Sequence, residues 1–325
     1  MSVLLEARGL VQQYTTGKSL FGRPGAVRAV DGIDLSVAEG EILGVVGESG
    51  SGKSTLGRML LGLETPFAGK VLYHGQPMPA PRTEHWRRLR AQMQLIFQDP
   101  LAALDRRMTV AAQIAEPLEI HGLARGAELA ERVEGLMGRV GLRRDQADRY
   151  PHELSGGQRQ RVVIARALAT SPRFLVCDEP VSALDVSIQA QVVNLLRDLQ
   201  EQDGLTMVFI SHDLKVVRNI CDRVAVMYLG RVVEEAPSDR IFADPRHPYT
   251  QALVSSIPRA GQGLGGRIIL HGEPPNPAAR PPGCAFHPRC RFADAGCAAQ
   301  VPRLENHGGR LAACLKLPCP ARQAA

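Results

Sequence analysis

The feature that most limits the fold of this chain is a glycine-rich turn between an apolar strand and a helix. The apolar run Ile42–Val46 predicts a buried strand, and the next residues, Gly47–Ser54, read G-x-x-x-x-G-K-S. Such a loop curls backbone N–H groups around a phosphate, while Lys53 adds positive charge and Ser54 offers a hydroxyl to Mg²⁺. A helix expected from Lys53 to Gly62 adds its N-terminal dipole. The pattern therefore predicts nucleotide binding rather than a chance glycine turn.

A second apolar strand, Phe174–Cys177, ends in two adjacent carboxylates. Ligands of parallel sheets bind at the carboxyl ends of strands, so we expect Asp178 to coordinate Mg²⁺ and Glu179 to polarise the attacking water. The alternative for Glu179 is an acid that only supports neighbouring residues of the site or faces solvent. His212 follows the strand Met207–Ile210, and we expect it to contact the γ-phosphate and orient Glu179.

A second serine- and glycine-rich helix start lies at Leu154–Gln158, before a helix expected from Arg159 to Ala169. One nucleotide needs only one such cradle. The segment Ser155, Gly156, Gly157 and Gln158 is therefore expected to bind an ATP held by another subunit. Helix capping by Ser155 alone would explain the serine but not the paired glycines.

The order of predicted elements gives an α/β fold. Short strands are expected within residues 3–46, and strands at residues 207–210 and 224–227 alternate with helices in the rhythm of a parallel sheet. Helical periodicity at residues 110–120 and 129–140 predicts an inserted helical subdomain at about residues 99–170. We place the main boundary near residue 240.

Charge and hydropathy exclude several classes of protein. The net charge is +6, but basic and acidic residues are interleaved, which argues against nucleic-acid binding. Residues 1–10 lack the apolar stretch of a signal peptide, and the apolar runs are far below the ~20 residues of a membrane-spanning helix. We expect a cytosolic chain whose membrane role depends on partner subunits.

Together these motifs resemble the ABC transporter ATPases, with Walker A at Gly47–Ser54, the signature at Leu154–Gln158 and Walker B at Phe174–Asp178. The resemblance implies a P-loop NTPase cassette with a RecA-like core, an antiparallel β subdomain and the helical subdomain. It implies that Gln98 senses Mg²⁺ and the γ-phosphate and that Tyr14 stacks on adenine. The expected Mg-ATP ligands are Tyr14, Gly47, Glu48, Ser49, Gly50, Ser51, Gly52, Lys53, Ser54, Thr55, Gln98, Asp178 and, in the D-loop, Asp185. Lys53, Glu179 and His212 are the expected catalytic residues, and Ser54, Gln98 and Asp178 the expected Mg²⁺ ligands.

Residues 241–325 resemble the C-terminal extension of dipeptide and oligopeptide importer ATPases, on the segments His247–Leu253 and Gly283–Phe286. The segments Gly17–Val30 and Ala115–Leu118 are similar to the F-type subunit. This implies a D-type ATPase as partner in a heterodimer, two transmembrane permease subunits, an extracytoplasmic peptide-binding protein and a place on the cytoplasmic face of the inner membrane. Nickel or glutathione import and a soluble ABC ATPase remain alternatives.

Five of the seven cysteines crowd into the last 42 residues, after a segment, residues 261–283, in which eleven of 23 residues are Gly or Pro. The spacing of Cys284, Cys290, Cys297 and Cys314 matches neither common zinc sites nor ferredoxin runs. The resemblance implies a [4Fe–4S] cluster on these four cysteines. Zinc and unligated thiols are the alternatives, and Cys319 has no assigned role.

Overall fold

The computed structural model describes residues 2–16, 25–258 and 267–317, and the chain divides into two compact units. The first unit comprises residues 1–4, 37–42 and 73–210, and the second comprises residues 5–36, 43–72 and 211–325. Most of the segment Gly17–Val30, part of the glycine- and proline-rich segment and Cys319 lie outside the described residues. No helix among the described residues is long and apolar enough to cross a membrane.

The first unit contains a parallel sheet in which β7 (Phe174–Asp178) lies between β6 (Met93–Ile96) and β8 (Thr206–Ser211). All five residues of β7 are buried, as expected of a continuous apolar strand covered on both faces. The unit also contains β5 (Gln76–Pro77), α2 (Glu84–Gln92) and α7 (Val186–Asp203). The strands predicted at Phe174–Cys177 and Met207–Ile210 are correct to within one residue at each end.

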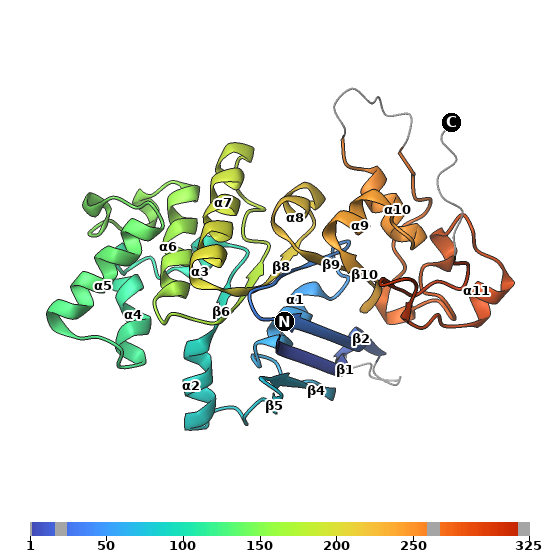
Figure 1. Ribbon diagram of the computed structural model, residues 1–325, viewed down its shortest axis with the longest axis horizontal. Coiled ribbons are helices and arrows are strands. Elements are labelled where there is room, and N and C mark those ends of the chain that lie inside the picture. Colours follow the sequence, from blue (N-terminus) through green and yellow to red (C-terminus); the bar gives the residue numbers. More distant parts are fainter. Residues whose placement is uncertain (1, 17–24, 259–266, 318–325) are drawn as a thin grey trace. The chain divides into compact units, whose positions relative to one another are not determined.

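Four helices follow β6 before the chain returns to β7 (Figure 1). They are α3 (Pro100–Ala103), α4 (Val110–Ile120), α5 (Gly126–Arg139) and α6 (Gly156–Leu168), with two 3₁₀ turns, η1 (Arg144–Gln146) and η2 (Pro151–Glu153). The helix predicted at residues 110–120 is confirmed with the same bounds, and the next helix begins three residues earlier than predicted.

The start of α6 is fixed by its own residues. Ser155 is the N-cap, its hydroxyl accepts the N–H of Gln158, and the Gln158 side chain accepts the N–H of Ser155 at 2.9 Å, which completes a capping box. A Cβ at Gly157 would lie 2.6 Å from Cγ2 of Ile188 on α7. Close packing of α6 on α7 therefore requires glycine at this position.

In the second unit, β3 (Ile42–Val46) runs parallel to β9 (Arg223–Tyr228), and β9 pairs antiparallel with β10 (Arg231–Pro237). The short strand β12 (Leu311–Ala312) pairs with β10, and β11 (Glu305–Asn306) pairs with β12. The chain end thus adds two strands to the sheet that contains β3.

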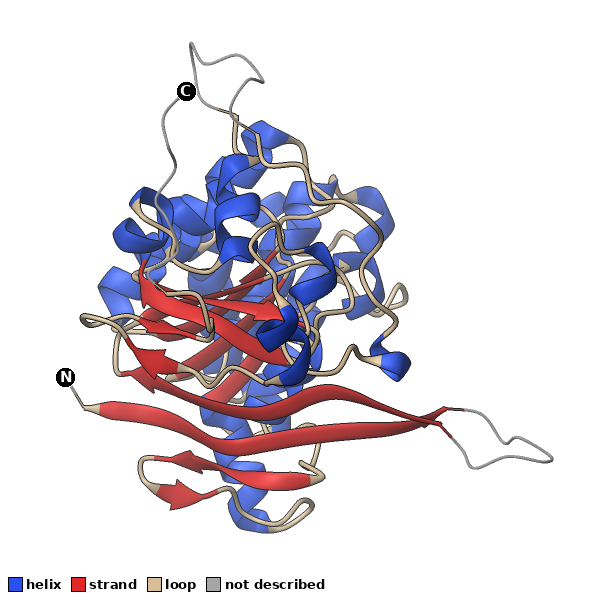
Figure 2. Cartoon of the chain, turned by 90° about the vertical axis from the view of Figure 1, so that its right-hand side faces the viewer, coloured by secondary structure: helices blue, strands red, loops and turns tan. Residues whose placement is uncertain are grey.

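The same unit holds the long strands β1 (Val3–Thr16) and β2 (Gly25–Ala38), which lie side by side with β4 (Ala68–Tyr73) next to β1 (Figure 2). The expectation of short strands was wrong. Gly9 interrupts the alternation of the sequence, but it adopts a φ of 56° and the strand continues through it.

The helices of the second unit are short, and they are concentrated after residue 210. They are α1 (Lys53–Leu60), α8 (Leu214–Ile220), α9 (Ser238–Ala243), α10 (Pro248–Ser255) and α11 (Ala295–Ala299), with 3₁₀ turns η4 (Pro277–Ala279) and η5 (His287–Arg289). Outside η4, the described part of the glycine- and proline-rich segment has no helix or strand.

A buried polar pair fixes the start of α10. The carboxylate of Glu234 accepts the backbone N–H groups of Arg246 and His247, each at 2.8 Å. His247 is the N-cap, and its Nδ1 accepts the N–H of Tyr249 at 3.1 Å. Burial lowers the pKa of His247 to about 3, so the ring is neutral in the folded chain.

The neutral, buried His247 predicts that stability falls in acid. The pKa of His247 in the folded chain lies below its unfolded value of about 6.5, so the stability contributed by the neutral ring is complete above about pH 6.5. This stability is lost as pH falls toward the folded pKa, by up to about 1.4 kcal/mol per pH unit. His247→Asn keeps a capping acceptor and should show a shallower fall of unfolding free energy between about pH 6.5 and 4. An equal slope in both proteins, measured by urea denaturation, would contradict this.

Tight packing at Gly157 predicts a steric penalty for the smallest side chain. Gly157→Ala should lower the unfolding free energy by about 1–3 kcal/mol, because the added methyl group overlaps Ile188. The matched change Gly138→Ala, on α5, meets no atom within 4 Å and should be tolerated. Adding Ile188→Ala should recover part of the unfolding free energy that Gly157→Ala removes. If the losses of the two single variants simply add in the double variant, the contact with Ile188 is not the cause.

Candidate nucleotide-binding site

The glycine-rich loop lies in the second unit, between β3 and α1. A Cβ at Gly47 would lie 2.2 Å from the carbonyl oxygen of Met227, and one at Gly52 would lie 2.0 Å from that of Ala29. Gly52, the N-cap of α1, also has a φ of 99°. The loop therefore packs against its neighbouring strands too closely for any side chain at these two positions.

Lys53 turns its side chain back into the loop. It is 5% exposed, and its Nζ donates to the carbonyl oxygens of Gly47 and Glu48, both at 2.9 Å. The N–H of Ser51 donates to the same Glu48 carbonyl at 3.2 Å. The ammonium group is thus held inside the curve of the loop, next to the backbone that is expected to surround a phosphate.

Tyr14 of β1 lies near the same loop and helix. Its side chain is 40% exposed, and its hydroxyl hydrogen-bonds to the carboxylate of Glu64 and to Thr55 of α1. The structure therefore brings together two residues predicted separately, Tyr14 and Thr55. An exposed ring whose hydroxyl is fixed presents a face on which a flat base could stack.

In the first unit, Asp178 and Glu179 end β7 as predicted. Asp178 is 8% exposed, whereas Glu179 is half-buried and adopts a φ of 48°, the left-handed region that a non-glycine residue rarely occupies. Its N–H donates to the carbonyl of Ile210 at 2.9 Å. Backbone strain of this kind is concentrated at functional sites, where it aims a side chain.

The side chain of Glu179 meets Gln98. The Nε2 of Gln98 donates to Oε2 of Glu179 at 3.2 Å, and Gln98 is exposed between β6 and α3. The two residues are 81 positions apart in the sequence, and each was predicted from its own motif. The structure places them in contact at the carboxyl ends of neighbouring strands.

The other predicted residues fall in both units. Ser155 to Gln158 form the capping box of α6, and Gly157 has a packing role inside the chain. Asp185 is the N-cap residue of α7, with no capping hydrogen bond from its side chain among the described residues. His212 is exposed and belongs, like the glycine-rich loop, to the second unit, whereas Gln98, Asp178 and Glu179 belong to the first.

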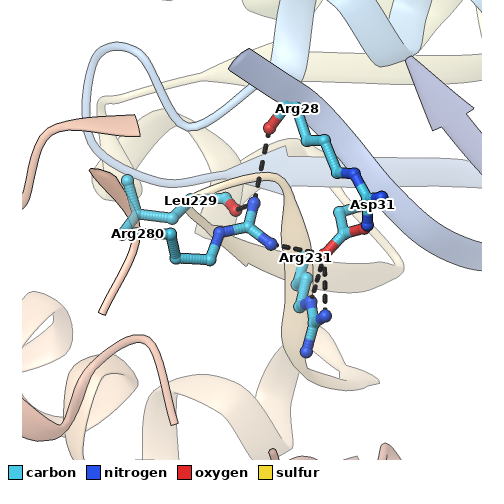
Figure 3. Close-up of polar contacts among 5 residues, drawn as sticks. All are labelled: Arg28, Asp31, Leu229, Arg231 and Arg280. Atoms are coloured by element: carbon cyan, nitrogen blue, oxygen red, sulfur yellow. Dashed lines mark hydrogen bonds and ion pairs between the residues drawn. The ribbon is translucent and has the colours of Figure 1, made fainter. Parts of the chain in front are cut away.

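Sequence reasoning missed the arginines that attach the C-terminal segment within the second unit. Arg280 binds the carboxylate of Asp31 and the carbonyl oxygens of Arg28 and Leu229 (Figure 3). Burial would raise the pKa of Asp31, but its hydrogen bond to Arg231 and the two arginine charges outweigh burial and lower it. No motif marks such residues, because their partners are distant in sequence.

Arg289 and Tyr249 were also missed, and both contact the glycine-rich loop at Glu48. Arg289 donates to both carboxylate oxygens of Glu48, at 2.8 and 3.1 Å. The hydroxyl of Tyr249 accepts the N–H of Glu48 at 2.9 Å. The chain end therefore takes part in the architecture of the loop.

The structure does not show the metal site predicted at the cysteines of the tail. The described residues contain no group of three or more His, Cys, Asp or Glu side chains placed to hold a metal ion. Cys297 is buried and Cys284, Cys290 and Cys314 are partly buried. Burial raises the pKa of Cys284 and Cys290 above that of an ordinary thiol.

Two families match parts of the sequence. Residues 30–182 match the ABC transporter family, and residues 233–297 match the oligopeptide/dipeptide transporter C-terminal region. The ATP-binding cassette MJ0796, solved in a dimeric state with ADP and Pi, is 29% identical with a TM-score of 0.65, covering 72% of this chain and 99% of that one. The P-loop α/β cassette fold predicted from the sequence is confirmed.

Curated relatives match over nearly the full length. A putative peptide import ATP-binding protein of Brucella ovis is 50% identical over 96% of this chain and 98% of its own. The oligopeptide transport protein AppF of Bacillus subtilis is 49% identical over 93% and 94%. The dipeptide transport protein DppF of Haemophilus influenzae is 48% identical over 97% of each chain. The chain therefore belongs to the ATP-binding subunits of the ABC transporter family, and it is an ATPase of the group that carries the oligopeptide/dipeptide transporter C-terminal region.

Proposed function

We propose that this ATPase energises the uptake of dipeptides or oligopeptides across the inner membrane, from its cytoplasmic face. The names of its relatives, which are peptide import, oligopeptide transport and dipeptide transport proteins, support peptides as cargo, as does the match at residues 233–297. Two transmembrane permease subunits, an extracytoplasmic peptide-binding protein and a second, D-type ATPase complete the proposed complex. The boundary near residue 240 separates the proposed nucleotide-binding domain from the extension.

The observation that carries the proposed coupling of ATP hydrolysis to transport is the hydrogen bond between Gln98 and Glu179. Glu179 is the proposed base that orients the attacking water, and its left-handed backbone fixes the direction of its carboxylate. Gln98 directly precedes Asp99, the N-cap of α3, where the inserted helices begin. A change at the carboxylate can therefore be passed to the helical segment that we propose faces the permease.

In the proposed reaction the loop Gly47–Ser54 holds the phosphates of ATP, with Lys53 neutralising charge on the β- and γ-phosphates. Asp178, Ser54 and Gln98 would hold Mg²⁺, which supplies charge stabilisation when bound, and His212 would contact the γ-phosphate. Ser155, Gly156, Gly157, Gln158 and Asp185 would face the ATP of the partner. Catalysis then rests on positioning and charge stabilisation, with no covalent enzyme intermediate.

Glu179→Gln tests the assigned base. The amide keeps the size of the side chain but cannot accept a proton, so ATP turnover in the assembled complex should fall about 10²–10⁴-fold while ATP binding persists. Glu201→Gln, a similar change at an exposed glutamate paired with Arg197 on α7, should leave turnover unchanged. Normal turnover of Glu179→Gln, measured by phosphate release, would remove Glu179 from the mechanism.

The [4Fe–4S] cluster on Cys284, Cys290, Cys297 and Cys314 remains a separate proposal. Its support is the crowding of five of the seven cysteines into the last 42 residues of the sequence. Protein purified without oxygen should then contain about four iron and four sulfide per chain and absorb visible light. Colourless, iron-free protein with normal ATPase activity would exclude the cluster.

A further inference from the structure

We infer that Arg289 and Tyr249 are positioning residues of the nucleotide loop, acting through Glu48. Both come from the C-terminal part of the chain, so this part belongs to the machinery that binds ATP. The inference rests on the proposed role of Gly47–Ser54 as the phosphate-binding loop. It also explains why the C-terminal extension and the nucleotide-binding cassette depend on each other, since residues of the extension fix a residue of the loop.

Three groups of Glu48 are engaged at once. Its carboxylate accepts two hydrogen bonds from Arg289, its N–H donates to the hydroxyl of Tyr249, and its carbonyl accepts from Lys53. Glu48 is the second residue of the loop, directly after Gly47. A residue fixed at all three polar groups fixes the peptide planes on either side of it, including the carbonyl that Lys53 contacts.

The ion pair has the geometry and burial of a strong contact. The two parallel N–H···O bonds match the fork of a guanidinium to the two oxygens of a carboxylate. The Arg289 side chain is 7% exposed and that of Glu48 is 28% exposed, so water screens the pair little. The hydrogen bonds to Glu48 raise the pKa of Arg289 above its ordinary value, so Arg289 stays charged.

Arg289 also leaves one buried group unsatisfied. Its Nε–H has no hydrogen-bond partner in the described part of the chain. A buried N–H without a partner costs free energy, and a long apolar side chain would avoid that cost. Among the described residues, the guanidinium makes its only bidentate pairing with Glu48. This pairing is the contact that can offset the cost of the unsatisfied N–H.

A cluster of aromatic rings fixes the segment that carries Arg289. Phe286, three residues earlier, is 2% exposed and packs against Tyr228, Tyr249 and His247 with ring centroids 5.3, 5.4 and 5.6 Å apart. Tyr228 and Tyr249 also contact each other at 4.7 Å. The 3₁₀ turn η5 then carries the chain from Phe286 to Arg289. The rings therefore set both the arginine and the tyrosine hydroxyl that reach Glu48.

The pair has two consequences for ATP. The ion pair holds the Glu48 carboxylate against Arg289. The positive charge of Arg289 then neutralises the negative charge of Glu48, which lies next to the position expected for the phosphates. The ion pair also fixes the loop before binding, so less conformational entropy is lost when ATP binds. Both effects favour the binding of nucleotide rather than the chemical step.

The test is the affinity of the full chain, assembled with its partner subunits, for a fluorescent ATP analogue with Mg²⁺. Arg289→Met should raise the Kd about tenfold, which corresponds to about 1.4 kcal/mol, and should raise KM for ATP while kcat changes little. Arg289→Lys keeps a charge and should recover part of the affinity. Tyr249→Phe, which removes one hydroxyl, should weaken binding in the same direction.

Arg310→Met is the matched control. Arg310 is another largely buried arginine of the chain end, bound to the carboxylate and carbonyl of Asp244, and no contact joins it to the loop in the described structure. It should leave the Kd within about twofold. An unchanged Kd in both Arg289→Met and Tyr249→Phe, or an equal loss in Arg310→Met, would overturn the inference.

A double-mutant cycle separates action through Glu48 from general damage. Glu48→Gln should weaken binding, and adding Arg289→Met to it should cause little further loss, because the same contact is already gone. Fully additive losses would contradict the inference. Lys53→Ala tests the proposed loop itself. If Lys53→Ala leaves ATP binding intact, the assignment of the loop fails. If Lys53→Ala abolishes binding while Arg289→Met and Tyr249→Phe leave it unchanged, only the role of Arg289 and Tyr249 fails.

Discussion

The close approach of the loop backbone to its own strands is the constraint on which the rest of the site depends. The carbonyl groups of Met227 and Ala29 lie where side chains would be at Gly47 and Gly52. This contact requires glycine at both ends of the loop, and the curved backbone between them has the form of a phosphate cradle. Lys53 can then turn inward, because the curve exposes two carbonyl oxygens to its ammonium group.

The C-terminal segment is attached to the same unit by charged contacts. Arg280 binds Asp31, which Arg231 also contacts, and Arg289 binds Glu48. Charged pairs of this kind are costly to break when partly buried, because one partner is left without compensation. The short strand β12 adds backbone pairing with β10. The segment is therefore an integral part of the second unit, although its composition alone suggests a loosely attached tail.

The sequence predicted the elements and motifs that depend on local patterns. The strand ending at Asp178, the helix at residues 110–120 and the loop at Gly47–Ser54 all follow from hydrophobic period, capping and glycine spacing. It did not predict the length of β1, because Gly9 interrupts the alternation of the sequence and yet lies, in the left-handed region, within a continuous strand. Nor did it predict the packing role of Gly157, which depends on Ile188 of another helix.

The contacts of Arg289 and Tyr249 with Glu48 were beyond sequence reasoning for the same reason. Each joins residues about 200 or more positions apart, and neither residue type is unusual in its local context. The contact of Gln98 with Glu179 shows the opposite case. Both were predicted from motifs, but only the fold shows that their side chains meet.

The central claim is that ATP lies between the loop Gly47–Ser54 of one ATPase subunit and the segment Ser155–Gln158 of another. Vanadate trapped with Mg-ADP in the assembled complex takes the place of the γ-phosphate, and ultraviolet light then cleaves the backbone next to it. We expect cleavage within both segments, mapped by mass spectrometry of the fragments. Cleavage confined to the loop Gly47–Ser54, with the Ser155–Gln158 segment intact in every subunit, would contradict a shared site.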